Sequence, residues 1–309
     1  MHRRSLLKGI AGGAAAAALA PVSLSLADER LSNPVGYATI SWPDEELTSA
    51  LQTISALGFQ GVQLLDFVTD VYPGPRASEL AQHLAGLRLE PVTLSVHKVV
   101  LDPARPHDET ANLRRDSEFF RTLKGHYLQV TDAGDPAGHY SHNVILAFGE
   151  RLNDLGKVAK DYGLELAYHP HDRTLGQTRE GLGQILDATD PKLVKLMADT
   201  GHLTLGGSDP SEVIRTYHQR LVALHFKDVR RDALELARAG HRQAHSARLR
   251  FCEVGQGAVN FPAIIDTLRE VRFDGWVIFE LDAYQPRPGG PRASAEMNRD
   301  AARRLGFRI

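Results

Sequence analysis

The chain has 309 residues, 42% of them hydrophobic, and a formal charge of −2. This length allows one large domain or two ordinary ones, and the apolar content is enough for a sizeable core. The slight acidic balance argues against a nucleic-acid-binding protein, which would carry a basic excess. A single cysteine, Cys252, excludes an internal disulfide and a metal cage made of thiolates.

The first 27 residues have the pattern of a targeting segment. They read "MHRRSLLKGIAGGAAAAALAPVSLSLA", with a charged start, an alanine-rich apolar stretch and small residues at the end. Arg3 and Arg4 resemble a twin-arginine export signal; an ordinary secretory signal or a retained anchor is the alternative. We therefore expect a signal peptide over 1–27, a linker over 28–35, and an exported, periplasmic or extracytoplasmic protein that uses the export machinery for folded proteins. No other segment approaches the roughly 20 apolar residues that span a bilayer, so we expect no permanent membrane span.

Short apolar runs and amphipathic stretches then alternate along the chain. The expected strands, in order, are residues 36–42, 61–67, 91–97, 126–132, 164–169, 193–199, 221–226 and 275–281. Between the first two, Leu47, Leu51 and Ile54 recur at helical spacing, and Gly58 follows as a helix-ending signal. This alternation predicts parallel βαβ units of the α/β class, and eight units in this length fit a single (β/α)8 TIM barrel over 36–309. An open doubly wound sheet is the alternative.

Four consecutive expected strands end on residues that can bind a metal. The fifth to eighth strands end at His169, Asp199, His225 and Glu280, respectively. Taken singly, a strand-end histidine is usually structural, Asp199 could cap a turn, and Glu280 could be a solvated charge at the rim. Taken together they predict one divalent cation, because neighbouring strands lie about 4.8 Å apart and active sites of such barrels form at this end. Imidazole ligands favour Mn, Fe, Co, Ni or Zn over Mg or Ca.

Three motifs carry a resemblance to a known family. "LMADTGH", "LHFKD" and "GQGAVNFPAIIDTLREVRFDGWVIFELD" resemble the signatures of strands 6, 7 and 8 of the xylose isomerase-like superfamily, which includes sugar phosphate isomerases/epimerases, D-tagatose 3-epimerase and inosose isomerases and dehydratases. The resemblance covers about residues 36–308. It implies a divalent metal held by the four residues above, and substrate contacts from His202, Arg231 and His97.

One departure from the family affects the expected mechanism. Epimerases of this superfamily have a glutamate as the strand 5 ligand, working opposite the strand 8 glutamate, and here His169 stands in its place. The nearby Glu165 is four residues earlier and is expected to lie deeper in the barrel. The mechanism with paired carboxylates is therefore in doubt for this chain.

The expected chemistry begins with removal of a proton next to a carbonyl group that the metal polarises. We assign catalysis to Glu280 as the base, His169 or His171 on the opposite face, and Lys227 as an oxyanion-stabilising group, although Lys227 could equally be a solvated lysine. The long polar segment 227–250 is expected to overhang the site. Trp42 could stack on a sugar ring or simply pack at the rim.

Three functions remain open from the sequence. The first is an isomerase or epimerase that acts on a keto-sugar, cyclitol or related small carbohydrate through a metal-stabilised enediolate. The second is a lyase or dehydratase with the same metal site, which loss of the second glutamate and export both favour. The third is an exported barrel that binds carbohydrate without catalysis. The sequence leaves the substrate and the oligomeric state open, a homo-oligomer included.

Overall fold

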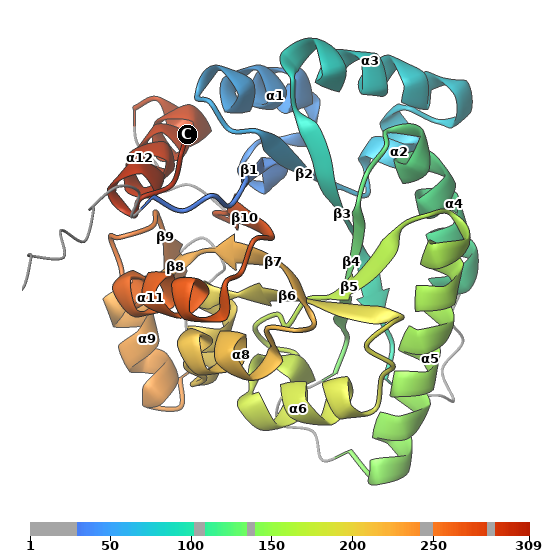
Figure 1. The fold of residues 1–309 in the computed structure, drawn as a ribbon, viewed down its shortest axis with the longest axis vertical. Coiled ribbons are helices and arrows are strands. Elements are labelled where there is room, and N and C mark those ends of the chain that lie inside the picture. The colour runs from blue at the N-terminus through green and yellow to red at the C-terminus, as the bar shows by residue number, and fades with distance from the viewer. Residues whose placement is uncertain (1–29, 102–108, 135–139, 242–249, 283–287) are drawn as a thin grey trace, which may run out of the picture.

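The structure is a computed structural model that describes residues 30–101, 109–134, 140–241, 250–282 and 288–309. Its centre is a closed barrel in which each strand pairs in parallel with its neighbours, in the order β1-β10-β7-β6-β5-β4-β3-β2 (Figure 1). The barrel strands are β1 Val35–Ala38, β2 Gly61–Leu65, β3 Glu90–Val99, β4 Tyr127–Asp132, β5 Glu165–Tyr168, β6 Val194–Asp199, β7 Leu221–Phe226 and β10 Trp276–Phe279. The predicted (β/α)8 barrel is confirmed, and the open sheet is wrong.

Helices surround the barrel on its outer side (Figure 1). The main ones are α1 Leu47–Ala56, α3 Ala77–Leu87, α4 Glu109–Thr122, α5 His142–Asp161, α6 Arg179–Asp187, α8 Pro210–Tyr217, α11 Phe261–Val271 and α12 Gly290–Arg304. The helix predicted from the spacing of Leu47, Leu51 and Ile54 is α1, and all three side chains are buried. Polar side chains begin two of the others: Ser141 caps α5 and Thr178 caps α6 by accepting a backbone N–H.

Short helices, 3₁₀ turns and a two-stranded sheet lie in the loops between the barrel strands and the main helices. They are α2 Val68–Val71, α7 Thr200–Gly206, α9 Arg231–Arg238, the 3₁₀ turns Thr39–Ser41, Asp44–Glu46, Gly74–Arg76 and Leu175–Gln177, and the two-stranded pair β8 Asp228–Val229 and β9 Phe251–Cys252. The run 36–42 is therefore strand only as far as Ala38. The polar segment 227–250 contains β8 and α9, and it returns to the barrel through the antiparallel pairing of β8 with β9.

The predicted signal peptide over 1–27 lies outside the described residues. The end of the predicted linker is part of the folded domain, because Leu31 forms a parallel bridge with Phe307. Asn33 Nδ2 also donates hydrogen bonds of 2.9 Å to the carbonyl oxygens of Phe273 and Gly275. Residues 31–35 thus belong to the base of the barrel. Among the described residues, no helix is both long and apolar enough to cross a membrane.

Strand register decides which side chains meet at the carboxyl end. Asp199 is the register partner of His225 across β6 and β7. Glu280 follows β10 directly, and its backbone N–H donates to the carbonyl oxygen of Phe226 at 3.1 Å. The backbone N–H of His169 similarly donates to Val130 at 2.7 Å. The four predicted ligands therefore all lie at the carboxyl ends of adjacent strands.

Candidate active site

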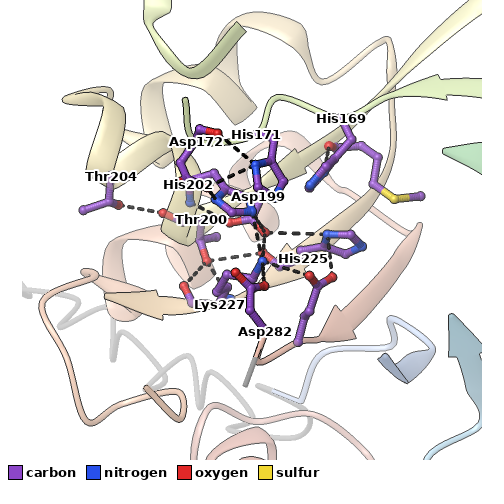
Figure 2. A network of polar contacts seen from close by, with 12 residues as sticks. His169, His171, Asp172, Asp199, Thr200, His202, Thr204, His225, Lys227 and Asp282 are labelled. Atoms are coloured by element: carbon purple, nitrogen blue, oxygen red, sulfur yellow. Dashed lines mark hydrogen bonds and ion pairs between the residues drawn. The ribbon is translucent and has the colours of Figure 1, made fainter. Parts of the chain in front are cut away.

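The four predicted metal ligands lie together at the carboxyl end of the barrel, and Figure 2 labels His169, Asp199 and His225 among them. All are nearly inaccessible to solvent: the exposed fractions are 1% for His169, 0% for Asp199 and His225, and 4% for Glu280. Glu280 is thus not the solvated rim charge that was its alternative explanation.

Ligand atoms of Asp199, His225 and Glu280 all lie within 4.8 Å of one another, and so do those of His169, Asp199 and His202. His225 Nδ1 is 3.0 Å from Glu280 Oε2 and 3.6 Å from Asp199 Oδ2. His169 Nδ1 lies 3.2 Å from the carbonyl oxygen of Met197, an arrangement that leaves Nε2 as the free ring nitrogen. The sequence prediction that these side chains converge agrees with this geometry.

The cluster contains buried polar atoms that a cation would satisfy. Both ring nitrogens of His225 and Asp199 Oδ2 are buried without an aligned hydrogen bond, which is costly unless another partner binds there. Asp199 also caps α7, since Oδ1 accepts from the backbone N–H of His202 at 2.7 Å. The capping explanation and the metal explanation are compatible, because they use different oxygens of Asp199.

The local electrostatics keep these groups in the protonation states that a cation requires. Burial lowers the pKa of His169 well below its ordinary value, and nearby His225 lowers it further, so the imidazole is neutral. Burial alone would raise the pKa of Asp199, but His202 and Lys227 hold it well below its usual range. The pKa of Glu280 is lowered in the same way, against burial, by His225 and Lys227.

Lys227 is completely buried and is the centre of the polar network (Figure 2). Its Nζ donates to Glu280 Oε1 at 2.8 Å and to Asp282 Oδ1 at 2.6 Å, and it lies 3.4 Å from Asp199 Oδ2. Burial alone lowers the pKa of Lys227, but these three carboxylates outweigh burial and raise it well above the ordinary value. The lysine is therefore a buried ammonium, and the alternative of a solvated lysine is wrong.

A second group of side chains lies beside the first. His171, Asp172 and His202 have ligand-type atoms within 4.8 Å of one another, and the rings of the two histidines lie 3.8 Å apart between centroids. His171 is the accessible member, with 34% of its side chain exposed. Burial alone lowers the pKa of His171, but its contact with the Asp172 carboxylate raises it overall. His171 and His202, predicted to face the substrate, are thus within the cluster.

Four residues of the cluster were not predicted. Gln63 of β2 donates to Glu280 Oε2 at 3.3 Å, and Arg250 contacts Asp172 through Nη1. Asp172 and Asp282 each lie within a few residues of a predicted ligand, so proximity along the chain could have indicated them. Gln63 and Arg250 carried no such signal.

The remaining predicted residues lie elsewhere or outside the description. Arg231 is exposed at the start of α9 and lines a surface hollow with Cys252 and Glu253, among others. Trp42 is only 7% exposed and packs edge-on against Tyr37 at 5.8 Å between ring centroids, which matches its alternative as a packed aromatic. His97 belongs to β3, but its side chain is outside the description.

Glu165 lies at the amino end of β5, and 49% of its side chain is exposed, so it is not deep in the barrel as expected. Its Oε1 is 3.6 Å from Lys195 Nζ. Glu165 therefore cannot replace the missing strand 5 glutamate, and the departure seen in the sequence remains in the structure.

A (β/α)8 barrel with two histidines and two carboxylates buried at the carboxyl ends of adjacent strands defines a class of barrel enzyme whose site can hold a divalent cation. Residues 51–301 match the family described as Xylose isomerase-like TIM barrel, and the chain belongs to this family. It is an enzyme of that family.

Individual relatives agree with this assignment. An inosose dehydratase of Bacillus velezensis is 33% identical over 269 residues, which cover 80% of this chain and 88% of that protein. A solved structure of the IOLI protein with a binding zinc atom has a TM-score of 0.68 at 17% identity, covering 88% of this chain and 98% of its own. D-psicose 3-epimerase with D-tagatose from Clostridium cellulolyticum H10 has a TM-score of 0.69 at 15% identity, covering 89% and 100%. The two structural matches show the fold alone.

Proposed function

We propose that this enzyme is a divalent-metal-dependent lyase that removes water from a keto-cyclitol of the inosose class. One observation carries the proposal: the cluster has a single carboxylate placed as a base, Glu280, and a histidine where an epimerase needs its second carboxylate. A reaction that needs one base and one proton donor suits this site better than one with two opposed bases. The inosose dehydratase relative supports the substrate class.

His169, Asp199, His225 and Glu280 would hold the cation, because they supply two neutral imidazoles and two ionised carboxylates within a buried cluster. When bound, a divalent cation would polarise the ketone of the substrate and acidify the neighbouring C–H group. The zinc in the IOLI structure supports this assignment, and the imidazole ligands favour a transition metal.

The residues of the chain would divide the proton transfers between them. Glu280 takes the proton from the carbon beside the ketone, and the C–H electron pair moves toward the carbonyl group. Lys227 holds Glu280 by one oxygen at 2.8 Å and places a positive charge beside the oxyanion that develops. The C–O bond of the β-hydroxyl then breaks while His171 supplies a proton, so that water leaves and a carbon–carbon double bond forms.

Isomerisation or epimerisation with the same metal ligands is the second candidate. It is favoured by the accessible His171, which would return the proton to the substrate. His169 would not, because its Nδ1 faces the Met197 carbonyl oxygen and its Nε2 would hold the cation. Glu280 would act as the base in both reactions, so the products and not the ligands distinguish them. The leader-like segment 1–27 supports an extracytoplasmic location for either reaction and agrees with an unphosphorylated substrate.

Mass spectrometry of the products tests the proposal. The protein, reconstituted separately with Mn²⁺, Co²⁺ and Zn²⁺, is incubated with 2-keto-cyclitols in H₂O and in D₂O. Loss of one water, abolished in Glu280→Gln and retained in Glu165→Gln, supports the lyase. A product that has the mass of the substrate in H₂O and contains deuterium when formed in D₂O supports the second candidate instead. Unchanged substrate without deuterium uptake refutes both and leaves the carbohydrate-binding barrel.

A further inference from the structure

Asp172 has no role in the mechanism above, yet it is buried and surrounded by nitrogen atoms. Its side chain is 4% exposed. Oδ1 lies 3.0 Å from His171 Nδ1 and 3.2 Å from His202 Nδ1, while Oδ2 contacts Arg250 Nη1. An isolated carboxylate is costly to bury, so the Asp172 carboxylate needs hydrogen-bond donors or positive charges beside it.

The contact of His202 with Lys227 decides what Asp172 does. Lys227 Nζ lies 2.9 Å from His202 Nε2, and a lysine ammonium can only donate hydrogen bonds. Nε2 must therefore accept with its lone pair, and the single ring proton of the neutral imidazole must be on Nδ1, which faces Asp172. Nδ1 and Oδ1 lie 3.2 Å apart without an aligned hydrogen bond, and a rotation of the ring would align the Nδ1–H group with Oδ1.

The same contact argues against a second metal ion bound by His171, Asp172 and His202. A metal on His202 Nδ1 would move the ring proton to Nε2, where it would point at the Lys227 ammonium. Arg250 adds another positive charge at the other oxygen of Asp172. The polar pattern suits a carboxylate that accepts from an imidazole better than one that binds a cation.

Arg250 and Phe251, which lie far from Asp172 in the sequence, pack against the Asp172–His202–Lys227 cluster. Arg250 precedes β9, which closes the segment that follows β7. The ring of Phe251 lies 5.0 Å from Lys227 Nζ and 5.1 Å from the centroid of the His202 ring. Phe251 is 1% exposed, so it covers the Lys227–His202 contact with an apolar surface.

We propose that Asp172 is a positioning residue that keeps His202 in the Nδ1–H tautomer, so that His202 holds the Lys227 ammonium beside Glu280. Arg250 occupies Oδ2, while the imidazoles of His171 and His202 share Oδ1. The consequence for catalysis rests on the proposed function, whereas the tautomer of His202 does not.

The tautomer is measured in metal-free protein by long-range ¹H–¹⁵N NMR of the ¹⁵N-labelled histidines, with His202 assigned by its absence in His202→Gln. We expect the Nδ1–H form in the native sequence. In Asp172→Asn, Arg250 retains the amide oxygen and the amide NH₂ faces His202, so the Nδ1–H form should be lost or mixed. An Nε2–H form in the native protein overturns the proposal, even if the variant fails to fold.

Kinetics of the metal-loaded enzyme test the chain of contacts. Asp172→Asn should lower kcat by about 10–100-fold with little change in KM, the usual effect of removing an outer partner of a site. Asp172→Asn should cost less activity in the His202→Gln background than in the native enzyme, because the contact between Asp172 and His202 is already gone there and only the contact with His171 remains to be lost. Asp209→Asn, at an exposed helix cap where asparagine serves equally well, is the matched control and should keep full activity.

Two results would contradict the positioning role. Additive losses in the double variant would mean that Asp172 acts independently of His202. Binding of two equivalents of Mn²⁺, with one lost in Asp172→Asn, would show a metal site instead. If the native enzyme turns over no keto-cyclitol, the proposed function fails, while the NMR measurement still decides the role of Asp172.

Discussion

Replacing Lys227 with methionine tests whether the Lys227 ammonium stabilises the protein by compensating the negative charge of the buried carboxylates. The Lys227 ammonium contacts the carboxylates of Asp199, Glu280 and Asp282 at 3.4, 2.8 and 2.6 Å. Methionine has a similar shape, so packing is largely retained while three buried or nearly buried carboxylates lose their shared cation. Removing one partner of a buried ion pair costs about 3–5 kcal/mol, and we expect a loss of this size in the free energy of unfolding of the metal-free protein.

The sign of the metal effect follows from the same contacts. A divalent cation brings positive charge to Asp199 and Glu280, so it should stabilise Lys227→Met more than the native protein. Urea unfolding with EDTA and then with Mn²⁺ measures both quantities. Lys195→Met is the control: Lys195 makes a partly exposed contact of 3.6 Å with Glu165, and such pairs contribute about 0–1 kcal/mol. Equal stability of native and Lys227→Met proteins in EDTA would refute the reasoning, as would equal stabilisation of both by Mn²⁺.

Two further predictions concern the ligands and the packing. Elemental mass spectrometry should find close to one transition metal per native chain, retained in Glu165→Gln but lost in His225→Ala and Glu280→Ala; metal that persists in both alanine variants would place the site elsewhere. Gly149→Ala in α5 should destabilise the protein by about 1–3 kcal/mol despite the better helix propensity of alanine, because the new Cβ would lie 2.2 Å from the carbonyl oxygen of Ala188. Gly86→Ala in α3 meets nothing within 4 Å and should raise the urea midpoint, corresponding to about 0.5–1 kcal/mol; a fall with Gly86→Ala would contradict the packing argument.

The barrel could be predicted because each strand and helix carries its own local signal. The run 221–226 coincides with β7, and the runs around Asp199 and Asp132 differ from β6 and β4 by one residue at their starts. Strand ends were harder to predict when apolar residues continue past the last ladder hydrogen bond. The apolar run that begins at Gly36 shows this, because its second half turns into a 3₁₀ helix.

The convergence of the four predicted metal ligands could be predicted for a similar reason: in a parallel barrel, residues at the carboxyl ends of neighbouring strands also lie close together in space. Arg250 could not be predicted, because it lies just before β9 and is brought to Asp172 only after the chain has passed through α9. The family resemblance implied that Arg231 contacts the substrate, but the helix that it begins leaves it exposed. Contacts made by residues in a long loop depend on how the loop folds back onto the barrel, and short sequence patterns do not predict that path.

The bridge between Leu31 and Phe307 has a consequence for how the chain could be rearranged. Leu31 N–H donates to the carbonyl oxygen of Gly306 at 3.0 Å, so both ends of the described chain meet at the amino end of the barrel, away from the predicted metal ligands. A short peptide joining these ends would leave every contact of the cluster unchanged. The exposed turn at Arg88, between α3 and β3, offers a place to open the chain again. The fold is therefore well suited to circular permutation, and attachments at either end need not obstruct the site.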